Sequence, residues 1–154
     1  MLPIRDLMTR DVLTLAPDCS IREAAEILST EHYSGAPVTE HGVLVGMLTA
    51  TDLLEFIASL PAEQPEVREQ SERGILDAHT IEEAMTRAPL RTMGPNESVA
   101  HAAAVMSREG IHRLPIVDEG KLVGLLSTTD LMRAVAERRL ERHVFVFPNR
   151  TRTS

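Results

Sequence analysis

Several residue types and patterns that would indicate particular functions are scarce or missing in this sequence. Aromatic residues make up 3% of the chain and tryptophan is absent, so the core must be built from aliphatic side chains and methionine. The single cysteine, Cys19, excludes an internal disulfide. No apolar run approaches the length of about 18 residues that a membrane span needs, and the first residues lack the pattern of a signal peptide. We therefore expect a cytoplasmic protein that does not associate with membranes.

The signatures of common enzymes and metal sites are also missing. The chain has no Walker loop and no Gly-x-Ser-x-Gly motif, which argues against nucleotide hydrolysis and against that type of serine nucleophile. Its six histidines form no i, i+4 pair and have no matching cysteine pair, so we expect no metal site. Cys19, next to Ser20 at an expected helix start, is a candidate for a lowered thiol pKa. We expect no catalytic residues and no enzymatic activity.

The net charge of −7 argues against nonspecific binding to nucleic acid. The charge is uneven, because residues 133–154 contain six arginines and two glutamates. This end of the chain is interpreted as a solvated terminus, with a partner contact or a nucleic-acid arm as alternatives. Within it, the apolar segment Val144–Phe147 either docks on its own domain or adds to a partner surface.

One pattern occurs twice in the chain. When the sequence is compared with itself at a shift of 78 residues, 15 of the 37 positions in residues 17–53 are identical. GMLTATDLL at 46–54 thus recurs as GLLSTTDLM at 124–132. Upstream, Ile4, Met8 and Thr9 recur at a shift of 77. A repeat of this size indicates two copies of one supersecondary unit, each too small to bury a good core alone.

Each copy predicts the same order of elements. Ser20 and Ser98 are expected to cap a helix whose buried face includes, in the first copy, Ile21, Ala24, Ala25 and Leu28. A leading helix and a strand precede this helix, and a hairpin with a glycine in its turn and a final helix follow it. These four elements are expected over residues 4–8, 12–15, 36–49 and 51–60, and again over 81–85, 90–93, 114–127 and 129–140.

The predicted fold is α+β, with two tandem β-α-β-β-α repeats packed with pseudo-two-fold symmetry. The expected boundaries are a first repeat over residues 1–60, a polar linker, a second repeat over 81–140, and a C-terminal tail over 141–154. The linker, residues 61–80, is polar and is interrupted by Pro61, Pro65 and Gly74. We interpret it as a segment of low order with room for one short helix.

The duplicated stretches VGMLTATDLL and HRLPIVDEGKLVGLLSTTDL resemble those of tandem CBS (cystathionine β-synthase) domains, also called a Bateman module. The resemblance covers roughly residues 4–60 and 81–140. It implies two clefts between the repeats that bind adenine nucleotides (AMP, ADP or ATP) or, less often, S-adenosylmethionine. It also implies a regulatory role, a homodimer, and an effector protein whose identity is unknown.

The Gly-x-x-Thr/Ser-x-x-Asp elements allow two interpretations that do not exclude each other. Thr49 with Asp52, and Ser127 with Asp130, have the spacing of a capping box at a helix start. The same helix end attracts an anion, and a carboxylate one turn further can accept hydrogen bonds from ribose hydroxyls. Gly46 and the equivalent glycine of the second copy allow close approach of either backbone or ligand.

The two copies differ just before the first hairpin strand, where the second has His112-Arg113 and the first has Ser34-Gly35. The stretch HRLPIVD is similar to one in the gamma regulatory subunit of AMP-activated protein kinase, which implies phosphate contacts. An arginine is well suited to this role, although a surface arginine and a polar strand-edge histidine would also explain the pair. The first cleft would then use Met47, Thr49, Thr51, Asp52, His112 and Arg113.

The second cleft would combine Ser34 and Gly35 with Ser127, Thr129 and Asp130. Because it lacks the cationic pair, we expect it to bind weakly, to prefer a less charged ligand, or to stay empty. Thr14 and Thr92, near the ends of the leading strands, are further candidate contacts. The alternative functions are a structural or interaction protein with vestigial clefts, and an S-adenosylmethionine-binding module.

Overall fold

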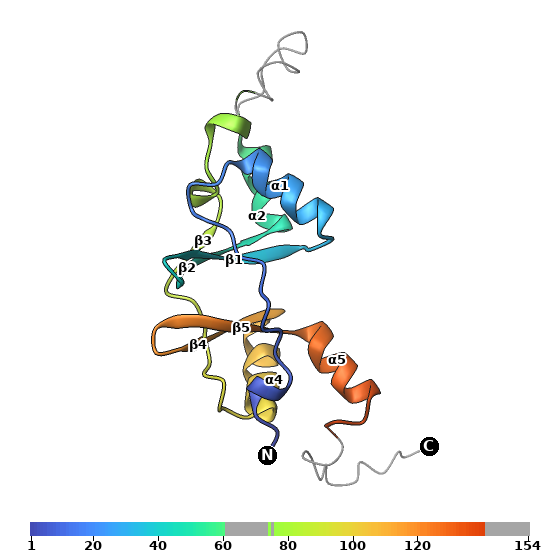
Figure 1. The fold of residues 1–154 in the computed structure, drawn as a ribbon. Coiled ribbons are helices and arrows are strands. Elements are labelled where there is room, and N and C mark those ends of the chain that lie inside the picture. Colours follow the sequence, from blue (N-terminus) through green and yellow to red (C-terminus); the bar gives the residue numbers. More distant parts are fainter. Residues whose placement is uncertain (61–73, 75, 141–154) are drawn as a thin grey trace, which may run out of the picture. The chain divides into compact units, whose positions relative to one another are not determined.

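The computed structural model describes residues 1–60, 74 and 76–140, which form two compact units (Figure 1). Unit 1 contains Met1–Asp11, Thr92–Glu119 and the described residues from Val123 onward. Unit 2 contains Val12–Arg91 together with Gly120–Leu122. Most of the expected linker and the whole C-terminal tail, including Val144–Phe147, lie outside the described residues; residues 76–78 at the linker's end are helical.

Unit 2 is built around the antiparallel sheet β1-β2-β3. The hairpin pairs Gly35 with Thr49 and Glu40 with Val43, with a bulge between Val38 and Thr39. The very short β3 adds to the other side of β2. The elements of this unit are α1 (Ile21–Thr30), β1 (Gly35–Glu40), β2 (Val43–Thr49), α2 (Ala50–Ser59), the 3-10 turn η2 (Ile81–Glu83) and β3 (Thr86–Arg87).

Unit 1 repeats this arrangement with a two-stranded sheet. Its elements are the 3-10 turn η1 (Ile4–Asp6), α4 (Val99–Glu109), β4 (Arg113–Asp118), β5 (Lys121–Ser127) and α5 (Thr128–Ala136), with the first residues of β5 counted in unit 2. The helix α4 ends at Gly110, whose φ of 65° is the left-handed conformation that favours glycine at this position.

The elements of the two units together confirm both predicted hairpins and all four main helices.

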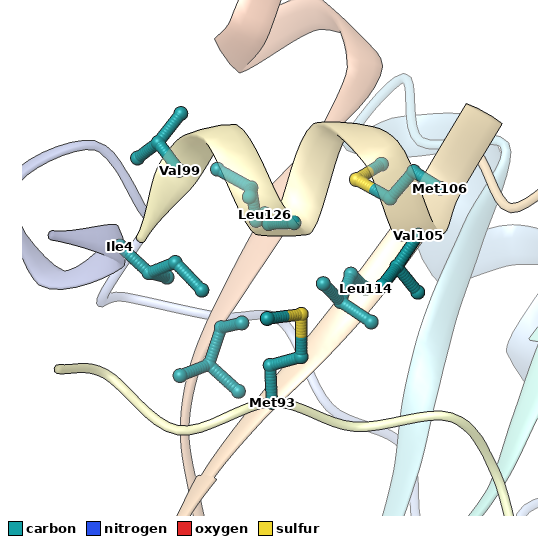
Figure 2. Close-up of a cluster of buried hydrophobic side chains, with 9 residues drawn as sticks. Ile4, Met93, Val99, Val105, Met106, Leu114 and Leu126 are labelled. Atoms are coloured by element: carbon teal, nitrogen blue, oxygen red, sulfur yellow. The ribbon is translucent and has the colours of Figure 1, made fainter. Parts of the chain in front are cut away.

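The leading segment of each repeat packs in the unit formed mainly by the other repeat. Ile4 is fully buried in the unit 1 core, beside Val99 and Met93 (Figure 2). Ile81 is fully buried in the unit 2 core with Leu15 and Ile21. The main-chain bonds are equivalent: Ile4 N–H donates to Glu97 O at 2.9 Å, and Ile81 N–H donates to Cys19 O at 2.8 Å. The compact units therefore do not coincide with the repeats as they follow one another along the chain.

The expected leading strands over residues 12–15 and 90–93 are reduced to single parallel bridges, from Leu15 to Val38 and from Met93 to Ile116. The main chain of Leu15 makes two hydrogen bonds with β1: its N–H donates to Pro37 O, and its carbonyl accepts from Thr39 N–H. Pro37 has no N–H with which to extend the ladder. The prediction of regular strands was wrong, because Pro37 cannot donate the next hydrogen bond of the ladder and Pro115 has the same position beside Met93.

Smaller differences concern the helices. The leading helices are single 3-10 turns of three residues, and α5 ends at Ala136, four residues before the predicted end. In α1, Ile21, Ala24 and Leu28 are buried as predicted, whereas Ala25 is exposed. Ala25 therefore lies outside the buried face, because the apolar stripe of α1 is narrower than predicted.

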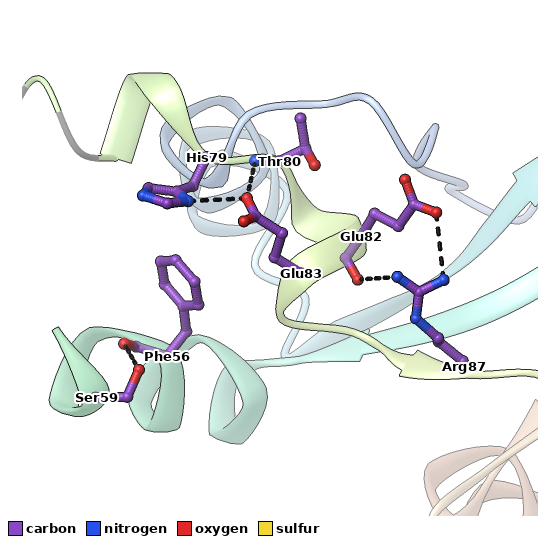
Figure 3. A network of polar contacts seen from close by, with 7 residues as sticks. All are labelled: Phe56, Ser59, His79, Thr80, Glu82, Glu83 and Arg87. Carbon is purple, nitrogen blue, oxygen red and sulfur yellow. Dashed lines mark hydrogen bonds and ion pairs between the residues drawn. The ribbon is translucent and has the colours of Figure 1, made fainter.

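A polar network ties η2 to the rest of unit 2 (Figure 3). The Glu83 carboxylate accepts from Thr80 N–H at 3.1 Å and lies 2.9 Å from His79 Nδ1. The His79 ring contacts Phe56 of α2 edge-on, with ring centroids 5.4 Å apart. On the other side of the turn, Arg87 of β3 pairs with Glu82 at 3.3 Å. The capped turn thus positions both β3 and the residues that face α2.

Candidate ligand-binding site

Both duplicated motifs form complete capping boxes at helix starts. At α2, Asp52 N–H donates to Thr49 Oγ1 at 3.2 Å, and Thr49 N–H donates to Asp52 Oδ2 at 2.9 Å. At α5, the corresponding distances for Ser127 and Asp130 are 3.1 and 2.8 Å. The capping interpretation is therefore confirmed. A ligand role stays compatible with it, because the box uses Oδ2 and leaves Oδ1 of Asp52 to accept from a ligand.

A further main-chain bond closes each helix start. Ala50 N–H donates to Ser34 O at 2.8 Å, and Thr128 N–H donates to His112 O at 3.0 Å. Two of the first three N–H groups of each helix therefore already have acceptors in the protein. An anion bound at one of these helix starts would therefore use the N–H group of Thr51 or Thr129 together with basic side chains.

The same bonds show which predicted site residues the fold brings together. In unit 2, Ser34 and Gly35 lie at the start of α2, since Gly35 is paired with Thr49. In unit 1, His112 and Arg113 lie at the start of α5, near Ser127. Each predicted cleft thus combines residues from unit 1 with residues from unit 2, and its assembly stays a prediction.

The predicted residues differ in exposure. His112, Ser34 and Thr51 are exposed, and Arg113 is half-buried. Met47 is 9% exposed in the centre of the sheet of unit 2, where it pairs with Pro37 and with Thr86. A purine could therefore contact only a small part of its side chain unless the surroundings move.

The two aspartates also differ. Among the described residues, Asp130 is the one charged side chain that is buried, and Arg133 Nη1 lies 3.7 Å from its Oδ1. Asp52 is only partly buried. Because a cation already neighbours the remaining oxygen of Asp130, Asp52 is the more available carboxylate for a ligand.

Thr14 and Thr92 each precede the residue that forms the parallel bridge to the hairpin, Leu15 and Met93 respectively. Thr14 is exposed and Thr92 is half-buried. The two positions are equivalent in the repeat and lie at the edge of the sheet in their own unit.

Gly46 accommodates the protein backbone. A Cβ atom at this position would lie 2.7 Å from the Met85 sulfur and 2.8 Å from Thr86 O. A Cβ atom at Gly124 would meet the equivalent Met8 and Thr9. Of the two explanations for these glycines, close approach of the backbone is therefore confirmed. The signal in the sequence was the recurrence of Met-Thr upstream of both repeats.

The surroundings of the Cys19 thiol raise its pKa, whereas a reactive thiol has a lowered pKa. Burial first, and then the neighbouring carboxylates of Glu23 and Asp18, raise its pKa to about 11. The expectation of a lowered pKa at a helix start was wrong, because burial of the thiol, and then the nearby negative charges, outweigh the effect of the helix dipole.

Sequence reasoning did not find a groove in unit 2 between α1 and α2. Its volume is about 460 Å³, and Leu53, Ile57 and Glu26 are among the residues that line it. None of the predicted ligand contacts lines this groove. Among the described residues, no three His, Cys, Asp or Glu side chains are grouped to hold a metal ion, and no helix there is long and apolar enough to cross a bilayer.

Comparison with known proteins gives a consistent result. A family model described as CBS domain matches residues 4–59 and 81–137. The CBS domain-containing protein YhcV of Bacillus subtilis (strain 168) is 34% identical over 131 residues, 85% of this chain and 84% of the relative. Other matched relatives are longer, and the chain spans 39% and 42% of two of them.

Solved structures are similar as well. The CBS domain pair of protein MJ0100, in complex with 5′-methylthioadenosine and S-adenosyl-L-methionine, has 29% identity and a TM-score of 0.71. That comparison covers 90% of this chain and 98% of the other. CBSX2 in complex with AMP has a TM-score of 0.73 over 90% of this chain and 99% of its own, with 24% identity, and thus supports the fold alone.

Proposed function

Because the chain belongs to the CBS-domain family, we propose that it is a regulatory module that binds an adenine nucleotide and transmits a conformational change to a partner protein. The predicted α+β fold of tandem CBS repeats is confirmed by the family match over both repeats and by the similar CBS pairs. A ligand acts by preferring one arrangement of the protein over another. We also propose that the protein acts in the cytoplasm.

The observation that carries the proposal is the duplicated capped helix start. Each box holds an aspartate carboxylate in a fixed orientation one turn into a helix, next to exposed hydroxyls such as that of Thr51. Such a carboxylate is suited to adjacent ribose hydroxyls. We propose that Asp52, Thr49, Thr51 and Met47 contact one nucleotide together with His112 and Arg113. Thr14 and Thr92 are proposed as further contacts.

We propose that the second site, with Ser127, Thr129 and Asp130 opposite Ser34 and Gly35, binds phosphate weakly. Ser34 and Gly35 carry no charge where the second repeat has His112-Arg113. The carboxylate of Asp130 also has Arg133 nearby. Both features favour a less charged ligand at this site.

S-Adenosylmethionine or 5′-methylthioadenosine is the second candidate ligand class. It is supported by the likeness to the MJ0100 pair, whose complex contains both molecules. These ligands have an adenosine group and no phosphate. They would use the ribose-binding carboxylates. Arg113 would have no anionic group to bind on 5′-methylthioadenosine and only the methionine carboxylate on S-adenosylmethionine.

Thermal unfolding with AMP, ADP, ATP, S-adenosylmethionine and 5′-methylthioadenosine tests the proposal. A ligand at 100 times its dissociation constant adds about 2.7 kcal/mol of stability. A rise in Tm with any one of them supports ligand sensing. No rise with any of them contradicts it and favours an interaction protein with vestigial clefts.

Arg113→Ala tests the site. We expect it to weaken phosphate-bearing nucleotides far more than adenosine, as measured by calorimetry, because only the former use the guanidinium. Ser34→Ala, at the position equivalent to His112 in the first repeat, serves as a control for the same nucleotide, because Ser34 is assigned to the other site. Equal losses for nucleotide and adenosine would remove Arg113 from the phosphate role.

We further propose that the module has no catalytic activity, that it requires no cofactor and that it forms a homodimer. Incubation with ATP, followed by assay of released phosphate, tests the first point. Release above the buffer rate would contradict it. Sedimentation of the purified chain tests the homodimer.

A further inference from the structure

Three arginines from two distant parts of the chain gather around η1 in unit 1. Arg10 Nη2 donates to Arg5 O at 3.1 Å, and Arg139 Nη2 donates to Asp6 O at 2.7 Å. The two accepting carbonyls belong to consecutive residues, so these guanidinium groups are attached to neighbouring points of one turn. The Arg5 side chain donates to the side chain of Asn96, just before α4. The fold thus brings three positive charges to one turn, the η1 arginine cluster.

The bonds to the main chain hold these arginines in place and use only a few of their donors. The last carbonyls of a helical turn have no partner within the turn, and basic side chains can satisfy them. This structural role needs one N–H group from an arginine, whereas a guanidinium has five. All three arginines are exposed, so most of their donors remain accessible to a ligand.

Acidic side chains do not balance the charge of the cluster. Among the described residues, Asp6 has the one carboxylate that pairs with any of the three arginines, and its Oδ1 lies 3.9 Å from Arg5 Nε. Within the same described part, Asp11 and Glu137 are near neighbours in the sequence but pair with none of the three. Residues 141–154, outside the described part, add three arginines and one glutamate. This turn therefore has an excess of positive charge, although the net charge of the chain is −7.

These properties favour a ligand that carries several carboxylates. A guanidinium binds a carboxylate through two parallel hydrogen bonds. A single carboxylate would bind weakly at exposed arginines, because solvent and salt screen the ion pair. A protein segment with several acidic side chains contacts several guanidinium groups at once, and the linked contacts reinforce one another. A nucleic acid is less suitable, since it would extend beyond the cluster along a chain of negative net charge.

We propose that the η1 arginine cluster is a docking site for an acidic segment of the partner protein. Carboxylates of that segment bind the guanidinium groups of Arg10 and Arg139, with Arg5 as a further contact. All three arginines belong to unit 1, and none of them is assigned to a nucleotide site. The inference rests on the proposed regulatory function, because it gives the chemistry of the partner, but docking itself needs no nucleotide.

A labelled decaglutamate peptide, titrated with the full chain and followed by fluorescence anisotropy, tests the proposal. We expect saturable binding that weakens as the salt concentration rises, because exposed ion pairs are screened. The double variant Arg10→Gln/Arg139→Gln should raise the dissociation constant at least about tenfold, since an exposed ion pair contributes up to about fivefold. Arg108→Gln removes an exposed arginine at the other end of α4 from Asn96 and should leave the dissociation constant nearly unchanged.

A second double variant separates docking from the structural role of the arginines. Arg10→Lys/Arg139→Lys keeps both charges and a donor for each carbonyl, so we expect its Tm to stay near that of the wild type. Its affinity for decaglutamate should fall severalfold, because an ammonium group does not bind a carboxylate through two parallel hydrogen bonds. Circular dichroism checks the folding of each variant. A folded glutamine variant with the affinity of the wild type overturns the proposal; if that variant is unfolded, unchanged affinity of the lysine variant overturns it.

Other anions test the chemistry of the partner. Duplex DNA and inorganic polyphosphate are titrated under the same conditions, and tighter binding of either than of decaglutamate would overturn the assignment to an acidic protein segment. No binding of decaglutamate at millimolar concentration would show that the arginines only satisfy the carbonyls of η1. Thermal shifts with nucleotide are measured separately, so a failure of docking and a failure of nucleotide binding are distinguished.

Discussion

The sulfur of Met85 lies 2.7 Å from the position that a Cβ atom on Gly46 would occupy. The contact joins β2 to the segment that follows η2, because Gly46 pairs with Arg87 across the sheet. A glycine is needed at this point of β2 so that a neighbouring segment can approach it closely.

We expect Gly46→Ala to destabilise the protein by about 1–3 kcal/mol, since the added methyl group overlaps the Met85 sulfur and Thr86 O. Urea unfolding followed by circular dichroism measures the change. Gly74→Ala is the control, because a Cβ atom there meets nothing within 4 Å. A loss of stability no larger than the control's would mean that the segment can move away freely.

Asp52→Asn separates capping from ligand binding. An asparagine oxygen can still accept from Thr49 N–H, so we expect a loss of stability below about 1 kcal/mol. The affinity for nucleotide should fall about tenfold, because the carboxylate is the stronger acceptor for ribose hydroxyls. Calorimetric titration with AMP and thermal unfolding measure the two effects.

The matched variant is Asp130→Asn, which alters the equivalent box at α5. We expect a similar or larger change in stability, because Asp130 is buried, but little effect on nucleotide binding at the site with Arg113. If both variants reduce affinity equally, the assignment of Asp52 to that site is wrong.

The raised pKa of Cys19 predicts a decline in stability at high pH. The thiol has a pKa near 9.0 when unperturbed and about 11 in the folded protein. Its contribution to stability is therefore fully present below pH 9.0 and is lost as the pH rises through the folded value. Unfolding free energies of the wild type and Cys19→Ser, compared across this window, should show a steeper decline for the wild type. Parallel curves would contradict the prediction.

The lowered pKa of Glu83 predicts a loss of stability at low pH. The hydrogen bond from His79, and then that from Thr80 N–H, lower the pKa of this carboxyl below its usual 4.5. Its contribution is present above pH 4.5 and is lost as the pH falls through the folded pKa. Glu83→Gln should therefore lower Tm at neutral pH and have a smaller effect in acid.

Glu82→Gln is the control for this prediction, because Glu82 lies in the same turn and pairs with Arg87 instead. A Tm difference between Glu83→Gln and the wild type that stays constant from neutral to acidic pH would show that the capping network does not depend on the carboxylate charge.

Much of the local structure could be predicted from the sequence, because it depends on interactions within a few residues. Thr49 with Asp52, and Ser127 with Asp130, form boxes that need only the local backbone. The hairpins followed from apolar runs around a glycine turn. The leading strands could not be predicted in the same way, since their single bridges depend on prolines in a strand more than 20 residues away.

The sequence by itself determined the duplication, the family, the hairpins and the capped helix starts. All of these depend on the spacing of residues close together in the chain and on the recurrence of one pattern. Only the tertiary structure decided that Ile4 and Ile81 are buried in the unit of the other repeat, that Cys19 lies among carboxylates, and that Leu54 and Met132 stay exposed. The physical reason is that the burial and the electrostatic surroundings of a residue depend on segments far apart in the chain. The packing of such segments cannot be predicted from a local sequence pattern.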